Sequence, residues 1–289
     1  MKNVPVTYLF CGNDEAALGS FLPEFAANKA GHVVLTDQII STIMQKYSFA
    51  NTIEKYLDET GLTFVDSHAP FGPEINMNQP VKALRNSMIL RHKLAINIAS
   101  YFKVDTITIH IGADPRFPDV PLEKQIDLVA ETLSELLVEA EKCNVVICIE
   151  NIWHRLNTPD MLLKIKSLFP TEYLGFCYDA GHANLMTNGK EFADGAANQA
   201  WNKFNESPDW NDPILEKMLP HIVNCHLHDN NGAVDEHKLC GTGTVDWKKI
   251  IPLLKSAPRL RNIQCESISS KNHFSVKEMV ESTQNILNI

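Results

Sequence analysis

The sequence lacks the signatures of several large protein classes. It has no Gly-x-Gly-x-x-Gly and no Walker-type phosphate loop, and its first predicted strand ends in Phe10-Cys11-Gly12-Asn13. A glycine-rich turn after an early strand is typical of doubly wound dinucleotide-binding sheets, so that class is disfavoured. No Ser/Gly-rich linker divides the 289 residues. We therefore expect a single domain over residues 1–289, a length that one large domain can fill.

Paired cysteines are also missing. The chain has seven cysteines, an odd number, and none forms a Cys-x-x-Cys motif. This usage indicates reduced thiols in a cytosolic protein and not a disulfide framework. Cys148, Cys177, Cys225 and Cys265 lie within predicted strands, so we expect them to pack in the core.

Long hydrophobic runs and an excess of positive charge are both absent. The N-terminal stretch MKNVPVTYLFCGND has only a short apolar run interrupted by Pro5, which fits neither a signal peptide nor a transmembrane span. The formal net charge of -9 argues against tight electrostatic binding to nucleic acid, where Lys and Arg neutralise phosphates. These features predict a cytoplasmic protein whose partners include neither a membrane nor nucleic acid.

What the sequence does contain is a regular alternation of short β-rich runs and longer helical patterns. Most of the β-rich runs are continuously apolar, as is typical of parallel strands covered on both faces. The predicted strands are Val6–Phe10, His32–Thr36, Thr63–His68, Asp105–Ile111, Val145–Asn151, Tyr173–Asp179, Ile222–His228 and Asn262–Glu266. Helical spacing predicts helices over Val81–Phe102, Leu122–Lys142, Thr158–Phe169, Ile214–Leu219, Asp246–Lys255 and Ser275–Leu287.

This alternation predicts the fold. Helix starts are indicated at Asn51-Thr52, at Thr158 before Pro159, and at Asp246. Eight β and about eight α segments in alternation, within fewer than 300 residues, are typical of a (β/α)₈ TIM barrel. The alternative is a doubly wound open sheet, which the missing phosphate loop disfavours.

Residues of metal-binding types stand at or just after the C-terminal ends of six consecutive predicted strands, the third to the eighth. In a (β/α)₈ barrel these ends converge on the face where active sites are built. A lone strand-end His or Asp is usually a cap or a core hydrogen-bonding group, but six in register are costly to bury without a cation. In chain order they are His68, His110, Glu150, Asp179, His182, His226, His228, Asp235, His237 and Glu266.

Imidazole and carboxylate together are the ligand set of Zn²⁺, Mn²⁺ or Fe²⁺. We therefore expect a divalent-metal site (Zn, Mn, Mg or Fe) that holds one to three ions. Other side chains near the strand ends are candidates for contacts with substrate, namely Arg116, Trp153 and His228. Asp229 is expected to orient a ligand imidazole or to cap the loop after the seventh strand.

These motifs resemble the xylose-isomerase-like barrel superfamily, over roughly Phe64 to Ser267. That superfamily contains sugar and sugar-phosphate isomerases and epimerases, and also the family 2 apurinic/apyrimidinic endonucleases of the endonuclease IV type. The resemblance to the isomerase branch implies one metal ion held by Glu150, Asp179, His226 and Glu266, with the two glutamates as catalytic acid and base. The resemblance to the endonuclease branch implies further ligands at His68, His110, His182, Asp235 and His237.

Two departures bear on the choice between these branches. Ketohexose 3-epimerases usually carry a substrate-contacting Glu and Arg where this chain has Leu156 and Gly232, which disfavours a free ketohexose as substrate. The endonucleases carry basic surface for DNA, whereas the loop after the first strand is acidic here, Gly12–Glu15. The polar stretch Asn198–Asp212, with Trp201 and Trp210, is a candidate lid or contact between copies in a homo-oligomer.

The resulting hypothesis is a metal-dependent isomerase or epimerase acting on a small sugar, sugar phosphate or polyol derivative. The alternative is a multi-zinc endonuclease or phosphodiesterase of the endonuclease IV type. A third hypothesis is a lyase or dehydratase on the same barrel.

Overall fold

The computed structural model describes residues 4–289, so the first three residues of the N-terminal stretch lie outside it. Eight parallel strands close into a barrel in chain order, from β1 to β8, and β8 pairs with β1. The strands are β1 Val6–Tyr8, β2 His32–Leu35, β3 Thr63–His68, β4 Thr106–Ile109, β5 Val146–Glu150, β6 Leu174–Asp179, β7 Ile222–Leu227 and β8 Asn262–Cys265. The predicted (β/α)₈ barrel is confirmed, and the open-sheet alternative is wrong.

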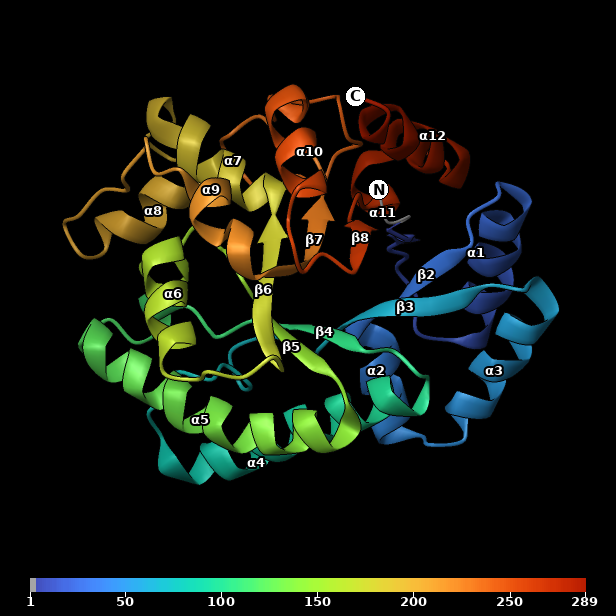
Figure 1. The fold of residues 1–289 in the computed structure, drawn as a ribbon, viewed down its shortest axis with the longest axis horizontal. Coiled ribbons are helices and arrows are strands. Elements are labelled where there is room, and N and C mark those ends of the chain that lie inside the picture. The colour runs from blue at the N-terminus through green and yellow to red at the C-terminus, as the bar shows by residue number, and fades with distance from the viewer. Residues whose placement is uncertain (1–3) are drawn as a thin grey trace.

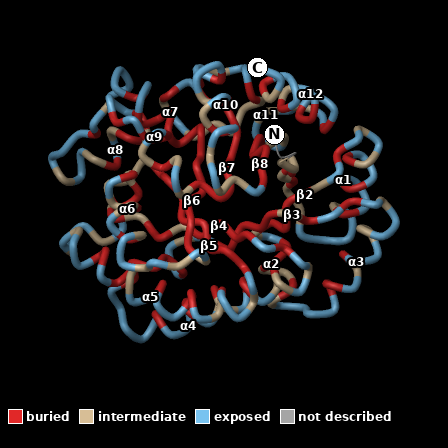
Figure 2. Tube along the Cα trace, viewed as in Figure 1, coloured by how far each residue is buried: buried red, intermediate tan, exposed pale blue. Residues whose placement is uncertain are grey.

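Helices surround the barrel on its outside (Figure 1). Their apolar faces pack on the strands, whereas their outer faces are exposed, as the burial pattern along the chain shows (Figure 2). The helices are α1 Glu15–Ala27, α2 Asp37–Gln45, α3 Phe49–Thr60, α4 Lys82–Tyr101, α5 Leu122–Cys143, α6 Pro159–Ser167, α7 Ala180–Asn188, α8 Ala196–Asn202, α9 Ile214–Met218, α10 Trp247–Lys255, α11 Ser269–Asn272 and α12 Val276–Leu287.

The first residue of a helix is set by local sequence in some helices and by packing in others. Asp246 caps α10, because its side chain accepts a hydrogen bond from the Lys249 N–H, as predicted. Pro159 is the first residue of α6, also as predicted. The predicted start at Asn51-Thr52 is wrong, since α3 begins at the buried Phe49. Burial of this aromatic ring, and not a side-chain cap, sets the start of α3.

The strands are shorter than predicted mainly at their C-terminal ends. β4 ends at Ile109, two residues before the predicted end, and the chain then turns through Gly112 with φ 115°. A Cβ atom at Gly112 would lie 2.1 Å from Asn78 Oδ1, so only glycine fits this close approach. The early end of the strand places His110 in the loop above the barrel.

Two composition-based expectations can be compared with the described residues. All seven cysteines are free, and the four predicted to pack within strands are fully buried. No helix in residues 4–289 is long and apolar enough to cross a membrane.

Candidate metal centre

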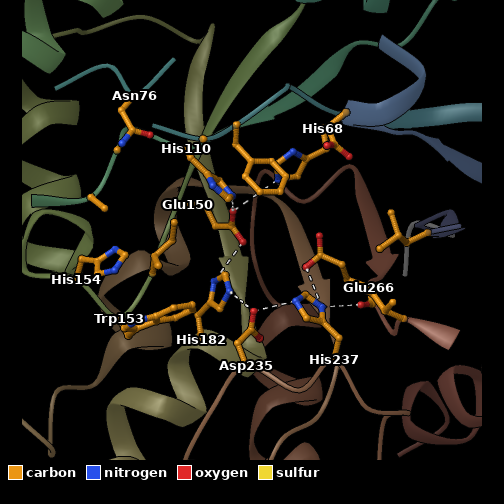
Figure 3. Close-up of a pocket in the computed structure, with 18 of the residues that line it drawn as sticks. His68, Asn76, His110, Glu150, Trp153, His154, His182, Asp235, His237 and Glu266 are labelled. Atoms are coloured by element: carbon orange, nitrogen blue, oxygen red, sulfur yellow. Dashed lines mark hydrogen bonds and ion pairs between the residues drawn. The ribbon is translucent and has the colours of Figure 1, made fainter. Parts of the chain in front are cut away.

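A pocket of about 420 Å³ opens at the C-terminal ends of the strands, a volume in the range of small-molecule sites. Its walls are loops that follow several different strands. Figure 3 shows histidine rings and carboxylates turned toward one another inside it. The sequence-predicted residues that line the pocket are His68, His110, Arg116, Glu150, Trp153, His182, Asp235, His237 and Glu266.

Four buried side chains meet at the base of this pocket, and we call them the floor cluster: Glu150, Asp179, His226 and Glu266. One ligand atom from each lies within 4.8 Å of the others. His226 Nδ1 lies 3.1 Å from Glu150 Oε1, 3.4 Å from Glu266 Oε2 and 3.8 Å from Asp179 Oδ2. Four strands, β5 to β8, thus bring their predicted ligands together around one imidazole nitrogen.

Glu150 also faces a second group of possible ligands. Its other oxygen, Oε2, lies 2.8 Å from His110 Nε2 and 3.9 Å from His68 Nε2, and the three residues meet the 4.8 Å condition as well. Phe71 packs beside both rings, with centroids 5.4 Å from His68 and 4.8 Å from His110. The carboxylate of Glu150 can therefore bridge two cation positions.

The loop after β7 brings a third group, which we call the loop cluster: His228, Asp235 and His237. His237 Nε2 lies 2.8 Å from Asp235 Oδ2, and His228 Nε2 lies 3.7 Å from Asp235 Oδ1. His182, at the start of α7, joins the loop cluster to the floor cluster. Its Nε2 lies 3.7 Å from Asp235 Oδ2, and its Nδ1 lies 3.4 Å from Glu150 Oε1.

Asp229 fixes the path of the loop that carries Asp235 and His237. Its carboxylate accepts hydrogen bonds from the backbone N–H groups of Asn230, Gly241 and Val245 and from the Trp247 indole. A Cβ atom at Gly243 would lie 2.3 Å from Asp229 Oδ1, so glycine is required beside this carboxylate. Of the two roles expected for Asp229, the geometry supports the cap of the loop.

The chain matches the family described as the xylose isomerase-like TIM barrel over residues 31–285. It belongs to this family. A relative named uncharacterized protein MJ1311, from Methanocaldococcus jannaschii, is 27% identical over 227 residues, which cover 76% of this chain and 70% of that protein.

Solved structures share the fold of this xylose isomerase-like barrel. A D-tagatose 3-epimerase-like protein superposes with a TM-score of 0.72 at 20% identity, covering 99% of this chain and 98% of that one. The IOLI protein with a binding zinc atom superposes with a TM-score of 0.71 at 14% identity, covering 98% of each chain. At these identities the likeness establishes the fold alone.

Two effects set the pKa values of the floor cluster: burial of the side chains and the close approach of opposite charges. Burial favours the neutral form of the Glu150 carboxyl, but His226 and His110 hold its pKa well below the usual value. The pKa of Glu266 is lowered against burial too, chiefly by His226. Burial favours neutral His226, whereas Cys177, Glu266 and Glu150 raise its pKa well above the usual range. The carboxylates of Glu150 and Glu266 are therefore ionised at neutral pH.

The donor atoms of these clusters fit a divalent cation. The floor cluster offers three carboxylates and one imidazole, the mixed ligand set that Zn²⁺, Mn²⁺ and Fe²⁺ accept. A cation at this position offsets the mutual repulsion of the carboxylates. In the loop cluster, the buried Asp235 Oδ1 has no hydrogen-bond partner within residues 4–289. An acceptor oxygen left in this way among imidazoles is suited to a metal ion.

The three side chains predicted to contact substrate have different positions. Arg116 and Trp153 line the pocket. Arg116 forms no ion pair within the described residues, so its charge faces the pocket uncompensated by protein. His228 is fully buried behind His237, with ring centroids 4.1 Å apart. His228 therefore lies outside the described pocket wall, behind His237 in the loop cluster, and its contact with substrate stays a prediction.

Asp37, Asn76 and Lys271 of the pocket wall were missed in the sequence, whereas His154, beside Trp153 after the fifth strand, was an open candidate for a substrate contact. Asp37 is the first residue of α2, two residues after the end of β2, and lines the pocket. The search for ligand-type residues near strand ends would have identified it if it had been extended to the second strand. His154 also lines the pocket, and burial lowers its pKa to about 3. Asn76, in the loop after β3, and Lys271, on the short helix α11, also line the pocket, and the sequence alone does not specify the fold of these segments.

The stretch Asn198–Asp212 does not line the pocket. Instead, the Trp201 indole donates a hydrogen bond of 2.9 Å to the Trp153 carbonyl oxygen. The Arg155 guanidinium lies 3.3 Å above the centre of the Phe204 ring. Trp201 and Phe204 thus hold the loop after β5, and hence Trp153, within the same chain; the predicted lid or contact between copies stays a prediction.

Proposed function

We propose that the chain is a divalent-metal-dependent isomerase or epimerase acting on a small sugar, sugar phosphate or polyol derivative. The observation that carries the proposal is the placement of Glu150 and Glu266. They come from β5 and β8, both line the pocket, and both approach the same nitrogen of His226. The names of the structural neighbours, including a D-tagatose 3-epimerase-like protein, support this reaction class.

In this proposal Glu150, Asp179, His226 and Glu266 hold the catalytic ion. When bound, a divalent cation polarises a substrate carbonyl and offsets the negative charge that develops as the adjacent C–H is deprotonated. The floor cluster supplies this site at the base of the pocket, where little water remains and electrostatic interactions are strong.

The chain's own carboxylates move the proton. One of Glu150 and Glu266 accepts the proton from the substrate carbon, and the other, or the same one, returns a proton to a neighbouring position or to the opposite face. Their lowered pKa values keep both in the basic form at neutral pH. Arg116 and Trp153 orient the substrate from the wall of the pocket.

The substrate differs from a free ketohexose in this proposal. Leu156 is fully buried, and neither it nor Gly232 lines the pocket. The polar contacts that ketohexose 3-epimerases place at these positions are therefore absent from the described pocket wall. Arg116 suits an anionic group on the substrate better than a hydroxyl alone.

The test is exchange of substrate hydrogen with solvent. Glu150→Gln and Glu266→Gln should each slow incorporation of deuterium from D₂O into a panel of sugars, sugar phosphates and polyols, by about 10²- to 10⁴-fold. Glu236→Gln is the matched control, since Glu236 lies in the loop beside Asp235 but pairs with Lys238 outside the pocket. Undiminished exchange in both pocket variants would show that neither glutamate is the base.

A second candidate function is phosphodiester hydrolysis by a multi-metal site of the endonuclease IV type. The specific observation in its favour is that all nine ligand positions implied by that branch lie in linked groups around Glu150. The net charge of -9 weighs against a DNA substrate. About three equivalents of zinc per chain, with cleavage of an abasic-site duplex, would favour this function over the isomerase.

A further inference from the structure

The barrel interior directly beneath the floor cluster is polar. TIM-barrel interiors are usually filled by layers of branched aliphatic side chains. Here a buried carboxylate, two amides and two hydroxyls occupy the interior, and each residue is at most 1% exposed: Asp66, Thr106, Thr108, Asn224 and Asn262. Burying such groups is costly unless they are hydrogen-bonded, so their arrangement calls for a reason beyond packing.

A continuous set of hydrogen bonds leads from Asp66 to His226. Asn224 Nδ2 lies 3.1 and 3.0 Å from the two oxygens of Asp66. The same nitrogen donates to Thr108 Oγ1 at 2.9 Å. Thr108 Oγ1 in turn lies 3.3 Å from Nε2 of His226. His226 thus contacts the floor cluster through Nδ1 and this chain of hydrogen bonds through Nε2.

Asp66 sets the direction of the hydrogen bonds that Asn224 makes, and the bond between Thr108 and His226 then follows the tautomer of His226. A carboxylate only accepts, so it fixes the Asn224 amide with its NH₂ group toward Asp66 and Thr108. The reverse orientation would place Asn224 Oδ1 against the carboxylate oxygens. With Asn224 donating, the Thr108 oxygen keeps a second lone pair available for a proton on His226 Nε2.

The tautomer of His226 determines whether it can bind a cation. An imidazole that carries its proton on Nε2 presents the lone pair of Nδ1, which is the atom facing Glu150, Asp179 and Glu266. The group bonded to the other ring nitrogen usually fixes the tautomer of a metal-binding histidine and raises its basicity.

We propose that Asp66 is a positioning residue for the metal centre. Acting through Asn224 and Thr108, it holds His226 with the proton on Nε2 and Nδ1 turned to the cation. This inference rests on the proposed function, because it assumes that the floor cluster binds a divalent ion. It assigns a role to a buried carboxylate that takes no part in proton transfer to substrate.

The first measurement is metal affinity without substrate. In Asp66→Asn, the affinity for Zn²⁺, measured by competition with a chromophoric chelator, should fall about 10- to 100-fold, as for other residues that orient ligands. The ¹⁵N–¹H signal of His226 Nε2 in the zinc-loaded protein, present in the wild type, should shift or be lost by exchange. Wild-type affinity together with an unchanged signal would overturn the inference.

Matched variants separate positioning from packing. Thr106 donates to Asp66 from the other side, at 2.7 Å, and Thr106→Val leaves the path to His226 intact. It should lower the free energy of unfolding but change zinc affinity less than threefold. A loss of zinc affinity equal to that in Asp66→Asn would assign Asp66 to packing alone.

If Asp66→Asn does not fold, Thr108→Val and Thr108→Ser carry the test. Valine should weaken zinc binding and serine should restore it, whereas equal affinities would contradict the inference.

The failure of this inference can be distinguished from failure of the proposed function. A wild-type protein that binds no zinc at the floor cluster would remove the basis of both. A wild-type protein that binds zinc, with Asp66→Asn binding it equally well, would remove only the role of Asp66.

Discussion

At the scale of single residues, the ring of His228 occupies the space where a side chain at Gly181 would stand. A Cβ atom at Gly181 would lie 2.0 Å from His228 Cε1. His228 cannot easily move away, because it stacks on His237 and its Nε2 lies 3.1 Å from Asp179 Oδ2. The absence of a side chain at position 181 is therefore a condition for the loop cluster.

Gly181→Ala should destabilise the protein. Overpacking of a rigid buried site costs about 1–3 kcal/mol, which exceeds the gain of up to about 1 kcal/mol from replacing Gly in a helix. Urea unfolding measures the net effect. Gly31→Ala is the control, because a Cβ atom there meets nothing within 4 Å, and it should change stability by less than about 0.5 kcal/mol. Equal stability of both variants would show that His228 yields without cost.

Residue types and the alternation of side chains along a strand predict the metal-ligand positions, but they do not predict the hydrogen bonds beneath the ligands. Glu150, Asp179 and Glu266 are predictable because each stands at the C-terminal end of a strand, where side chains of one parity face inward. The link between Asp66 and Asn224 is not predictable in this way, since it joins residues 158 positions apart through a particular amide orientation. Hydrogen-bond directions of this kind depend on the registers of several strands at once.

At the scale of elements, the loop between β3 and α4 forms part of the pocket wall and is tied to the helices by side-chain hydrogen bonds. Arg85, buried on α4, donates to the carbonyl oxygens of Met77 and Gln79 and also to that of Leu128 on α5. His92 Nε2, on the same helix, lies 2.8 Å from the Ile75 carbonyl oxygen. Two polar side chains of α4 thus hold the segment that carries Asn76.

The burial of His92 makes this wall sensitive to acid. Burial lowers the pKa of His92 to about 4, assisted by Arg91 and His110, from 6.5 in an open environment. Between these values the unfolded chain binds a proton that the folded chain does not. The contribution of neutral His92 is complete above pH 6.5 and is lost as the pH falls toward 4, by up to about 3 kcal/mol.

His92→Gln tests this dependence, because glutamine keeps a donor but does not titrate. The stability difference between wild type and variant, from urea unfolding, should be largest at pH 7.5 and should shrink or reverse at pH 5. His273→Asn, at an exposed position, is the control for loss of an imidazole that does not support the wall. A constant difference for His92→Gln between the two pH values would contradict the lowered pKa.

Element boundaries show the same division between local and long-range causes. The starts of α6 and α10 depend on local sequence, so Pro159 and Asp246 predict them. The start of α3 depends on burial of Phe49 against other elements, so the local signal at Asn51-Thr52 misleads. The role of Trp201 in holding Trp153 is likewise tertiary, because it joins helix α8 to the loop after β5.

At the scale of the whole molecule, the metal ligands connect strands that are distant in the chain. The floor cluster joins β5 to β8, and Glu150 extends the link to His68 on β3 and His110 after β4. A cation bound there would bridge six of the eight strands of the closed barrel through the ligands and their contacts. Metal binding should therefore affect the stability of the entire fold and not only the site.

Removal of metal by a chelator should lower the free energy of unfolding of the whole barrel. A ligand that binds only the folded state stabilises it by about 2.7 kcal/mol when present at 100 times its Kd. Urea unfolding of chelator-treated protein, with and without added Mn²⁺ or Zn²⁺, measures this difference.

His226→Gln should lose the response to metal, because the nitrogen at the centre of the floor cluster is gone. An Asp235→Asn/His237→Asn double variant should keep most of the response if the floor cluster alone holds the stabilising ion. If that double variant loses the response completely, the stabilising ion belongs to the loop cluster, and the assignment of the catalytic ion to β5–β8 fails.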